Sequence, residues 1–321
     1  MARLVAHAIG GAAALLGRRQ WLARRLLALG RLVPGRSPRA RVYQVFSWRL
    51  GDGIRDRYEV GTVAGRMLVD PQTLIGRVLA VSGEWEPHVT SAFRGLLSPG
   101  DVCVDVGAHI GYYTLLASRV VGPAGRVYAL EPSLRVHRTL ASNLVLNASE
   151  NVTALNVAAG QAAGSALLYE GPGPSPLTSS LSARMLDAPH GGRADEFVAT
   201  PVPVVALDDV VPADVLPRVR VVKIDVEGYE VEVLRGMDAL LRAADRIALF
   251  VETSPDWAVE DPAPFLAELC EAHGLSPYVL QNDYSLDGYF PRRLVRPIAV
   301  STIPRERRDL MLVRGARPRD A

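Results

Sequence analysis

The chain has 321 residues, of which 49% are hydrophobic, and its formal net charge is +2. A chain of this length can bury a large core. Basic and acidic residues are interspersed without an aromatic and basic stripe, which argues against nucleic-acid binding. The two cysteines, Cys103 and Cys270, form neither a disulfide framework nor a metal-binding pattern, so we expect a cytoplasmic protein.

Residues 1–34 place leucines on one helical face, with arginines to the sides. The charge-free stretch from Leu4 to Gly17 is too short and glycine-broken to span a bilayer, and its flanks are not those of a signal peptide. We expect a helix that packs on the domain or on a second subunit. The alternative is a peripheral membrane contact, with the helix lying on an anionic surface.

Three regions are predicted along the chain. Residues 1–40 form the Arg-rich helix and a linker, residues 41–98 an N-terminal appendage or cap, and residues 99–316 the main domain. Within the appendage, the segments RVYQVFSW and AGRMLVD indicate short strands over residues 41–80, and a helix follows over residues 81–101.

The main domain alternates strand and helix patterns, which predicts an α/β fold with a mostly parallel sheet and helices on both faces. After the opening strand and its helix at 112–121, strands are expected at 125–132, 151–160, 218–228, 245–253, 277–282 and 308–315, and helices at 134–147, about 229–241, and 262–274. Residues 160–203 and 282–305 interrupt the alternation. We expect a hairpin and a mobile loop in the first interruption.

The opening unit of this domain is DVCVDVGAHIGYYT, residues 101–114. A buried strand turns through Gly107 and Gly111 into a helix, which brings backbone N–H groups and a helix N-terminus to the carboxyl edge of the sheet. One glycine permits the reversal, and the other permits close approach of the backbone to a ligand. This arrangement is typical of a nucleotide-like cofactor site.

The spacing of the turn favours one cofactor over another. A dinucleotide fingerprint has glycine where this chain has His109, and an imidazole obstructs the approach of a pyrophosphate. Asp105, ahead of the turn, suits a cationic group such as the α-amino group of S-adenosylmethionine. The next strand ends in Glu131, followed by Pro132, and a carboxylate there accepts hydrogen bonds from ribose hydroxyls.

A second group of polar residues is Lys223-Ile-Asp225-Val-Glu227-Gly228. Strand alternation points Lys223, Asp225 and Glu227 to one side, and ionisable groups are costly inside a parallel sheet unless they are paired or used. Glu252 ends the next strand at the same edge. The alternatives are a structural ion pair or a divalent-ion site, although no spacing demands a metal. Lys223 is also the only lysine in the chain.

These motifs, DVGAHIGYYT, ALEP, TSSL, VVALDD, VVKIDVEGYEVEVLRG and FVE, resemble the FkbM family of S-adenosylmethionine-dependent methyltransferases. The likeness runs from about Trp85 through Thr253, although the family usually has asparagine where this chain has His109. It implies a Rossmann-like class I methyltransferase fold with seven strands and an antiparallel last strand. It also implies O-methylation of a hydroxyl on a sugar, polyketide or other secondary metabolite, so the partner is a small-molecule or glycan acceptor.

The resemblance and the residue patterns together predict two sets of site residues. The cofactor-binding set is Asp105, Gly107, Ala108, Gly111, Tyr113, Glu131 and Pro132. In the catalytic set, Asp225 and Glu227 are candidate bases, Lys223 tunes the carboxylates or holds substrate, and His109 is the second-choice base. The competing readings are a nicotinamide-dependent oxidoreductase and a non-catalytic domain recruited to a membrane or an assembly.

Overall fold

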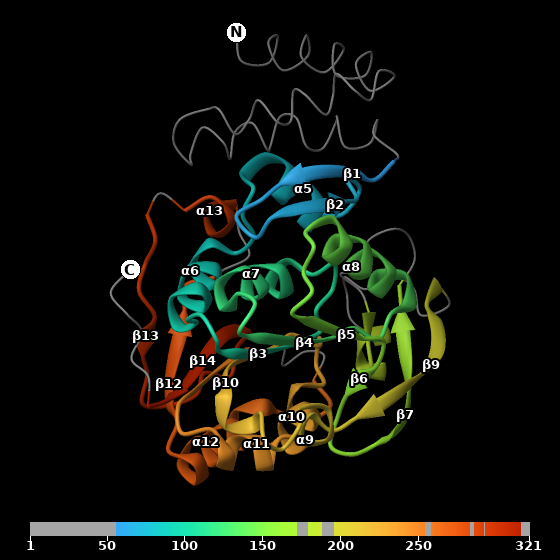
Figure 1. Cartoon of the computed structure of the whole chain (residues 1–321). Helices are drawn as coiled ribbons and strands as arrows, with labels where there is room; N and C mark the ends of the chain where they lie inside the picture. The colour runs from blue at the N-terminus through green and yellow to red at the C-terminus, as the bar shows by residue number, and fades with distance from the viewer. Residues whose placement is uncertain are drawn as a thin grey trace, which may run out of the picture. The chain divides into compact units, whose positions relative to one another are not determined.

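The computed structural model describes residues 56–171, 179–187, 196–253, 258–282, 286–291 and 293–315 (Figure 1). They divide into two compact units. One holds the described residues up to Pro87 and those from 286 to Leu294, and the other holds the remainder. The helix predicted over residues 1–34 and the RVYQVFSW segment lie outside the described residues. The domain boundaries given above stay a prediction.

Within the described residues, the smaller unit contains a hairpin and two helices. Strands β1 (Tyr58–Gly61) and β2 (Arg66–Val69) pair antiparallel, and helices α5 (Leu74–Ser82) and α13 (Leu286–Tyr289) accompany them. Helix α5 lies in the segment where only short strands were predicted, and that expectation was wrong. The side chain of Thr73 caps the amide of Gly76 at 3.0 Å, and Gly83 ends the helix in the left-handed region.

The larger unit is built on an eight-stranded sheet in the order β13-β12-β14-β11-β10-β3-β4-β5. The bounds are β3 Val102–Val106, β4 Arg126–Leu130, β5 Val152–Leu155, β10 Val219–Ile224, β11 Ile247–Thr253, β12 Ser276–Leu280, β13 Ile298–Ala299 and β14 Arg308–Arg314. Neighbours from β11 through β5 run parallel, while β14 is antiparallel to both β11 and β12. The mostly parallel sheet with an antiparallel last strand is therefore confirmed. The eighth strand, β13, is a two-residue addition to the predicted seven.

Helices cover both faces of this sheet. Figure 1 shows α6 (Pro87–Leu96), α7 (Tyr112–Val121) and α8 (Leu134–Leu146) on one side, and α9 (Leu207–Val210), α10 (Glu230–Arg235), α11 (Asp238–Ala243) and α12 (Pro262–His273) on the other. The single helix predicted over 229–241 is in fact two, α10 and α11. At the break, a Cβ on Gly236 would lie 2.0 Å from the carbonyl oxygen of Gly160. Among the described residues, no helix is long and apolar enough to cross a membrane.

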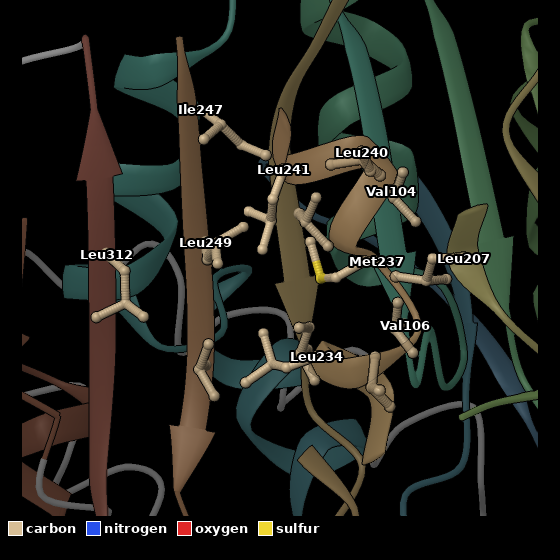
Figure 2. Close-up of a cluster of buried hydrophobic side chains, with 14 of the residues drawn as sticks. Val104, Val106, Leu207, Leu234, Met237, Leu240, Leu241, Ile247, Leu249 and Leu312 are labelled. Atoms are coloured by element: carbon tan, nitrogen blue, oxygen red, sulfur yellow. The ribbon is translucent and has the colours of Figure 1, made fainter. Parts of the chain in front are cut away.

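The two faces of the sheet differ in chemistry because successive strand residues point to opposite sides. Figure 2 shows the face toward α10 and α11, where Val104, Val106 and Leu249 pack against Leu234 and Met237. This side is entirely apolar at its centre. The ionisable residues of the same strands point to the other side, toward α7.

A four-stranded sheet in the order β6-β9-β7-β8 follows β5. Its strands are β6 (Ala158–Ala159), β7 (Gly164–Glu170), β8 (Ser179–Ser180) and β9 (Val198–Val205). The strand predicted over 151–160 therefore ends early, at Leu155, and its last residues join this second sheet. Part of the predicted mobile loop lies outside the described residues.

Candidate active site

Lys223 is the centre of the polar face. It is 5% exposed and lies in register with Asp105 on β3 and Phe250 on β11, so these side chains leave the sheet on the same side. Its Nζ donates a 2.6 Å hydrogen bond to Oδ2 of Asp225 and lies 4.7 Å from the centroid of the Tyr113 ring. A compact ammonium can make both contacts in this space, which gives the chain's only lysine a physical role.

Asp225 is held by two neighbours. Burial opposes its ionisation, but the charge of Lys223 and hydrogen bonds from Lys223 and Glu252 outweigh burial and lower the pKa of Asp225. The pKa of Glu252 is raised well above its ordinary value by burial and by the charges of Asp225 and Glu227. Arg307 donates to Oε1 of Glu252, with its Nε at 3.0 Å. Asp225 is therefore the ionised member of this group.

Glu227 lies beyond the end of β10. The strand predicted over 218–228 stops at Ile224, and Glu227 adopts a left-handed backbone with φ of 53°. Its carbonyl oxygen accepts a 2.6 Å hydrogen bond from the hydroxyl of Ser180. Its buried Oε2 has no hydrogen-bond partner in the described chain and lies 4.0 Å from a guanidinium nitrogen of Arg307. Burial and the charge of Asp225 raise the pKa of Glu227 to about 8.

The carboxyl groups of Asp225, Glu227 and Glu252 lie close together, although Glu252 belongs to β11 and the other two residues follow the end of β10. One oxygen from each lies within 4.8 Å of the others, close enough to share a cation. Lys223 and Arg307 already bring two positive charges to these carboxyls. With Asp225 ionised and the pKa values of Glu227 and Glu252 raised, the group has no surplus negative charge that would need a metal ion for balance.

The glycine turn differs from the expected anion-binding loop. The backbone N–H groups of Gly107 and Ala108 donate to the carbonyl of Leu130, and that of Gly111 donates to Ala108. The N–H of His109 donates to Oε2 of Glu131. These four donors are therefore used inside the protein.

Gly107 is needed where the turn after β3 meets the end of β10. Its φ is +76°, and a Cβ at this position would lie 1.9 Å from the carbonyl oxygen of Asp225. The turn after β3 and the end of β10 therefore touch through their backbones. This contact brings the predicted cofactor turn beside the three carboxyls of Asp225, Glu227 and Glu252.

Glu131 and His109 occupy the other end of the polar edge. Both carboxylate oxygens of Glu131 accept backbone N–H groups at 2.9 Å, from His109 and from Ser133. Burial, only partly offset by these two bonds, raises the pKa of Glu131 to about 7. His109 has a left-handed backbone, and burial lowers its pKa to about 4. Its Nε2 is buried and finds no partner among the described residues.

The remaining predicted residues lie further inside the protein. Asp105 is 2% exposed and accepts a 2.6 Å hydrogen bond from Thr114. Burial raises the pKa of Asp105. Tyr113 packs on Phe93 with ring centroids 5.1 Å apart, and Ala108 is 4% exposed. These side chains are all buried, whereas Pro132 continues the Glu131 loop and is half-buried.

Sequence reasoning missed a serine connection between the two ends of the site. The hydroxyl of Ser133, next to the Glu131 loop, donates to Glu170 at 2.6 Å, and Glu170 pairs with Ser179 across β7 and β8. Ser180 then binds the carbonyl of Glu227. The TSSL motif contains Ser179 and Ser180, and it was the signal that pointed to this strand. Arg307 was missed as well, because nothing in its neighbourhood distinguishes it from the other arginines.

Relatives of the chain are methyltransferases or contain a matching segment. It is 32% identical over 155 residues to the methyltransferase sdnD of Sordaria araneosa. This matched region covers 42% of the chain and 60% of sdnD. It is 26% identical over 201 residues to the hexuronic acid methyltransferase AglP of Haloferax volcanii, covering 62% of the chain and 74% of AglP. It is 31% identical over 217 residues to the AMB antimetabolite synthetase AmbE of Pseudomonas aeruginosa. That match covers 58% of the chain and only 10% of AmbE.

The family comparison covers the site itself. The model of the methyltransferase FkbM domain matches residues 105–275, more than half of the chain, from Asp105 in β3 to just beyond α12. The match includes the glycine turn, Glu131 and the three carboxyls of Asp225, Glu227 and Glu252. The chain therefore belongs to the FkbM methyltransferase domain family, and its methyl donor is S-adenosylmethionine.

Proposed function

We propose that this methyltransferase transfers the methyl group to a hydroxyl of a sugar, polyketide or other secondary metabolite, with Glu227 as the general base. The observation that carries the proposal is the partly buried carboxyl of Glu227, whose pKa is raised to about 8 and whose Oε2 has no hydrogen-bond partner within the described residues. A base with a pKa near the working pH is well suited to take a proton from a weakly acidic alcohol.

The other two candidate bases are less suitable. Asp225 is tied to Lys223 and Glu252 and has a lowered pKa, so it is a weak base. The pKa of His109 is lowered to about 4, which leaves its ring neutral but weakly basic. We assign Asp225 and Lys223 to orienting the site, and we place His109 at the cofactor side through its unpartnered Nε2.

The polar edge fits the cofactor. Glu131 ends β4 beside the turn, and each of its oxygens accepts one backbone N–H, which leaves each a lone pair for a ribose hydroxyl. The turn offers few unused backbone donors, which suits the α-ammonium group of S-adenosylmethionine better than a pyrophosphate. When bound, S-adenosylmethionine supplies an electrophilic methyl group. The protein's contribution is then to align the acceptor oxygen and to remove its proton.

The relatives guide the choice of acceptor class. AglP is named as a hexuronic acid methyltransferase, and sdnD is named as a methyltransferase. The chain spans 60% of sdnD and a tenth of AmbE, so the activity of neither whole protein is transferred here. A hydroxylated small molecule or glycan agrees with the AglP name and with the need for a base.

Calorimetric titration of the full chain with S-adenosylhomocysteine, and in parallel with NADH, tests the donor side of the proposal. We expect binding of the first ligand and none of NADH, with affinity lost in Glu131→Ala. Glu150→Ala, which changes a carboxylate on the loop after α8, is the control. Methyl transfer is then measured with alcohol, amine and thiol acceptors. Transfer to amines or thiols but not to alcohols would exclude O-methylation.

A further inference from the structure

Asn282 is a buried side-chain amide without a hydrogen-bond partner among the described residues. It follows β12, and its backbone N–H closes a tight turn onto the carbonyl of Leu280 at 2.9 Å. The side chain is 4% exposed, and neither its nitrogen nor its oxygen has a hydrogen-bond partner in the structure as described. Buried amides are almost always satisfied, so an amide with both ends unpaired marks a place where a polar group is missing.

The sheet register places Asn282 at the same edge of the main sheet as the three carboxyls of Asp225, Glu227 and Glu252. Leu280 and Glu252 both pair with Asp309, one from each side of β14. Ile224 pairs with Val251, so Asp225 follows at the same level on β10. Strands are spaced by about 4.8 Å, which puts the end of β12 about 10 Å from Glu252 and about 14 Å from Asp225.

A second unsatisfied group lies close to Glu227. The backbone N–H of Ser182 donates to the hydroxyl of Ser180 at 2.9 Å, and that hydroxyl donates to the carbonyl of Glu227. The side chain of Ser182 is 1% exposed, and its Oγ has no partner in the described parts of the chain. The edge therefore has one neutral hydrogen-bonding group linked through Ser180 to the backbone of Glu227, and another two strands beyond Glu252.

We propose that Asn282 binds the non-reacting hydroxyl groups of a polyhydroxylated, saccharide-class acceptor, with Ser182 contacting the acceptor beside Glu227. This inference rests on the function proposed above and narrows it. An amide offers donors and an acceptor together, which matches neighbouring hydroxyls and matches neither a bare cation nor a bare anion. The distance from Asn282 to Glu252 and Asp225 exceeds what a simple alcohol can bridge. The acceptor therefore carries further hydroxyls that lie far from the one that is methylated.

A measurement of thermal stability tests, in the absence of a methyl acceptor, whether the side chain of Asn282 has a structural role. Asn282→Leu removes two unpaired polar atoms from a buried position, so we expect its melting temperature to rise in the ligand-free protein. Asn143→Leu is the matched control. Asn143 is fully buried, but its amide donates to the carbonyl of Ile110 at 2.8 Å, so its loss must lower the melting temperature. A fall for Asn282→Leu would show a structural role and overturn the inference.

A kinetic measurement tests the acceptor class. S-adenosylhomocysteine release is followed with cellobiose, cellotriose and maltotriose as polyhydroxylated acceptors long enough to span about 10 Å, and with cyclohexanol as a monohydroxylated one. We expect Asn282→Ala to lower kcat/KM for the polyhydroxylated acceptors at least about tenfold, mainly through KM. The affinity for S-adenosylhomocysteine and the rate with cyclohexanol should be unchanged. Gln281→Ala, which alters the exposed neighbouring amide, is the control.

The outcomes separate this inference from the function on which it rests. If cyclohexanol is methylated and the polyhydroxylated acceptors are not, the inference fails while O-methylation stands. Equal kinetics for Asn282→Ala and the unaltered protein, even with a raised melting temperature, also overturn it. If none of the four compounds is methylated by protein that binds S-adenosylhomocysteine, both the inference and the hydroxyl-acceptor proposal are contradicted.

Discussion

The hydroxyl of Ser180 donates a 2.6 Å hydrogen bond to the backbone carbonyl of Glu227, 47 residues further along the chain. Ser180 is 1% exposed and belongs to β8 of the second sheet, whereas Glu227 follows β10 of the main sheet. The backbone of Glu227 is left-handed, a conformation that a residue with a Cβ rarely adopts without support. Ser180 supplies part of that support and so positions the proposed base.

Ser180→Ala should therefore slow methyl transfer without changing donor binding. We expect kcat to fall about tenfold or more, because small displacements of a catalytic group are costly, while the Kd of S-adenosylhomocysteine stays constant. Steady-state kinetics and calorimetry provide the two readouts. Ser180→Thr retains a hydroxyl and should recover part of the rate, and Ser142→Ala on the exposed side of α8 is the control. A loss of donor affinity equal to the loss of rate would indicate general unfolding instead.

Glu227→Gln should remove the base and leave the rest of the site in place. We expect kcat to fall by about 10²–10⁴-fold with S-adenosylhomocysteine affinity retained. In the unaltered enzyme the rate should rise with pH and level off above about 8, the pKa of Glu227. That dependence should be absent from the residual rate of the variant. Glu232→Gln, in the nearby helix α10, should behave like the unaltered enzyme, and a normal rate for Glu227→Gln would reject the assignment.

The same carboxyl should make the protein less stable as pH rises. The folded pKa of Glu227, about 8, is above its ordinary value of 4.5, so unfolding releases a proton between these two pH values. The contribution of Glu227 to stability is present below pH 4.5 and is lost as pH rises through 8. Glu227→Gln should therefore gain melting temperature over the unaltered protein as pH increases from 5 to 8. A difference that is constant over this range would contradict the raised pKa.

Binding of S-adenosylhomocysteine should depend on the ionisation of Glu131. Its pKa is raised to about 7, and the ionised form is the better acceptor for ribose hydroxyls. We expect the Kd to decrease between pH 6 and 8 and then to level off. Glu131→Gln should bind more weakly above pH 7 and show a flatter pH profile in calorimetry. If the variant keeps the pH profile of the unaltered protein, another group is responsible.

Gly107→Ala should destabilise the fold as well as the site. The new Cβ would lie 1.9 Å from the carbonyl oxygen of Asp225, in a backbone conformation with φ of +76°. A loss of more than about 1 kcal/mol in the free energy of unfolding is expected, measured by denaturant titration. Gly95→Ala is the matched control, because a Cβ there meets nothing within 4 Å. Equal stability of the two variants would mean that the turn can move away from β10.

The alternating pattern predicted the main sheet because buried parallel strands give continuous apolar runs with glycine or acidic residues at their ends. Strand β3, with all five residues buried, is the clearest case. The pattern failed where tertiary contacts decide the structure. Gly236 divides the helix predicted over 229–241 because Gly160, far away in sequence, occupies the space beside it. Residues 158–159 leave the main sheet because they pair with β9.

The site was predictable in its residues but not in their ionisation. The motif identified Lys223, Asp225 and Glu227, yet only the three-dimensional arrangement distinguishes the two carboxyls. Asp225 is within 2.6 Å of the ammonium, whereas Glu227 has a left-handed backbone and an oxygen without a hydrogen-bond partner among the described residues. Ser182 and Asn282 are ordinary polar residues in sequence. Their burial without partners becomes visible only when the strands are aligned.

The position of Lys223 also determines how the chain responds to chemical labelling. Reagents that acylate or alkylate side-chain amines usually modify many surface lysines, but this sequence contains one, which is 5% exposed and paired with Asp225. A reagent can reach that amine only if the side chains around it, including Asp225 and Tyr113, move apart. A single mass increment on Lys223 therefore reports on the integrity of the active site, and protection of that amine measures how firmly the site is closed.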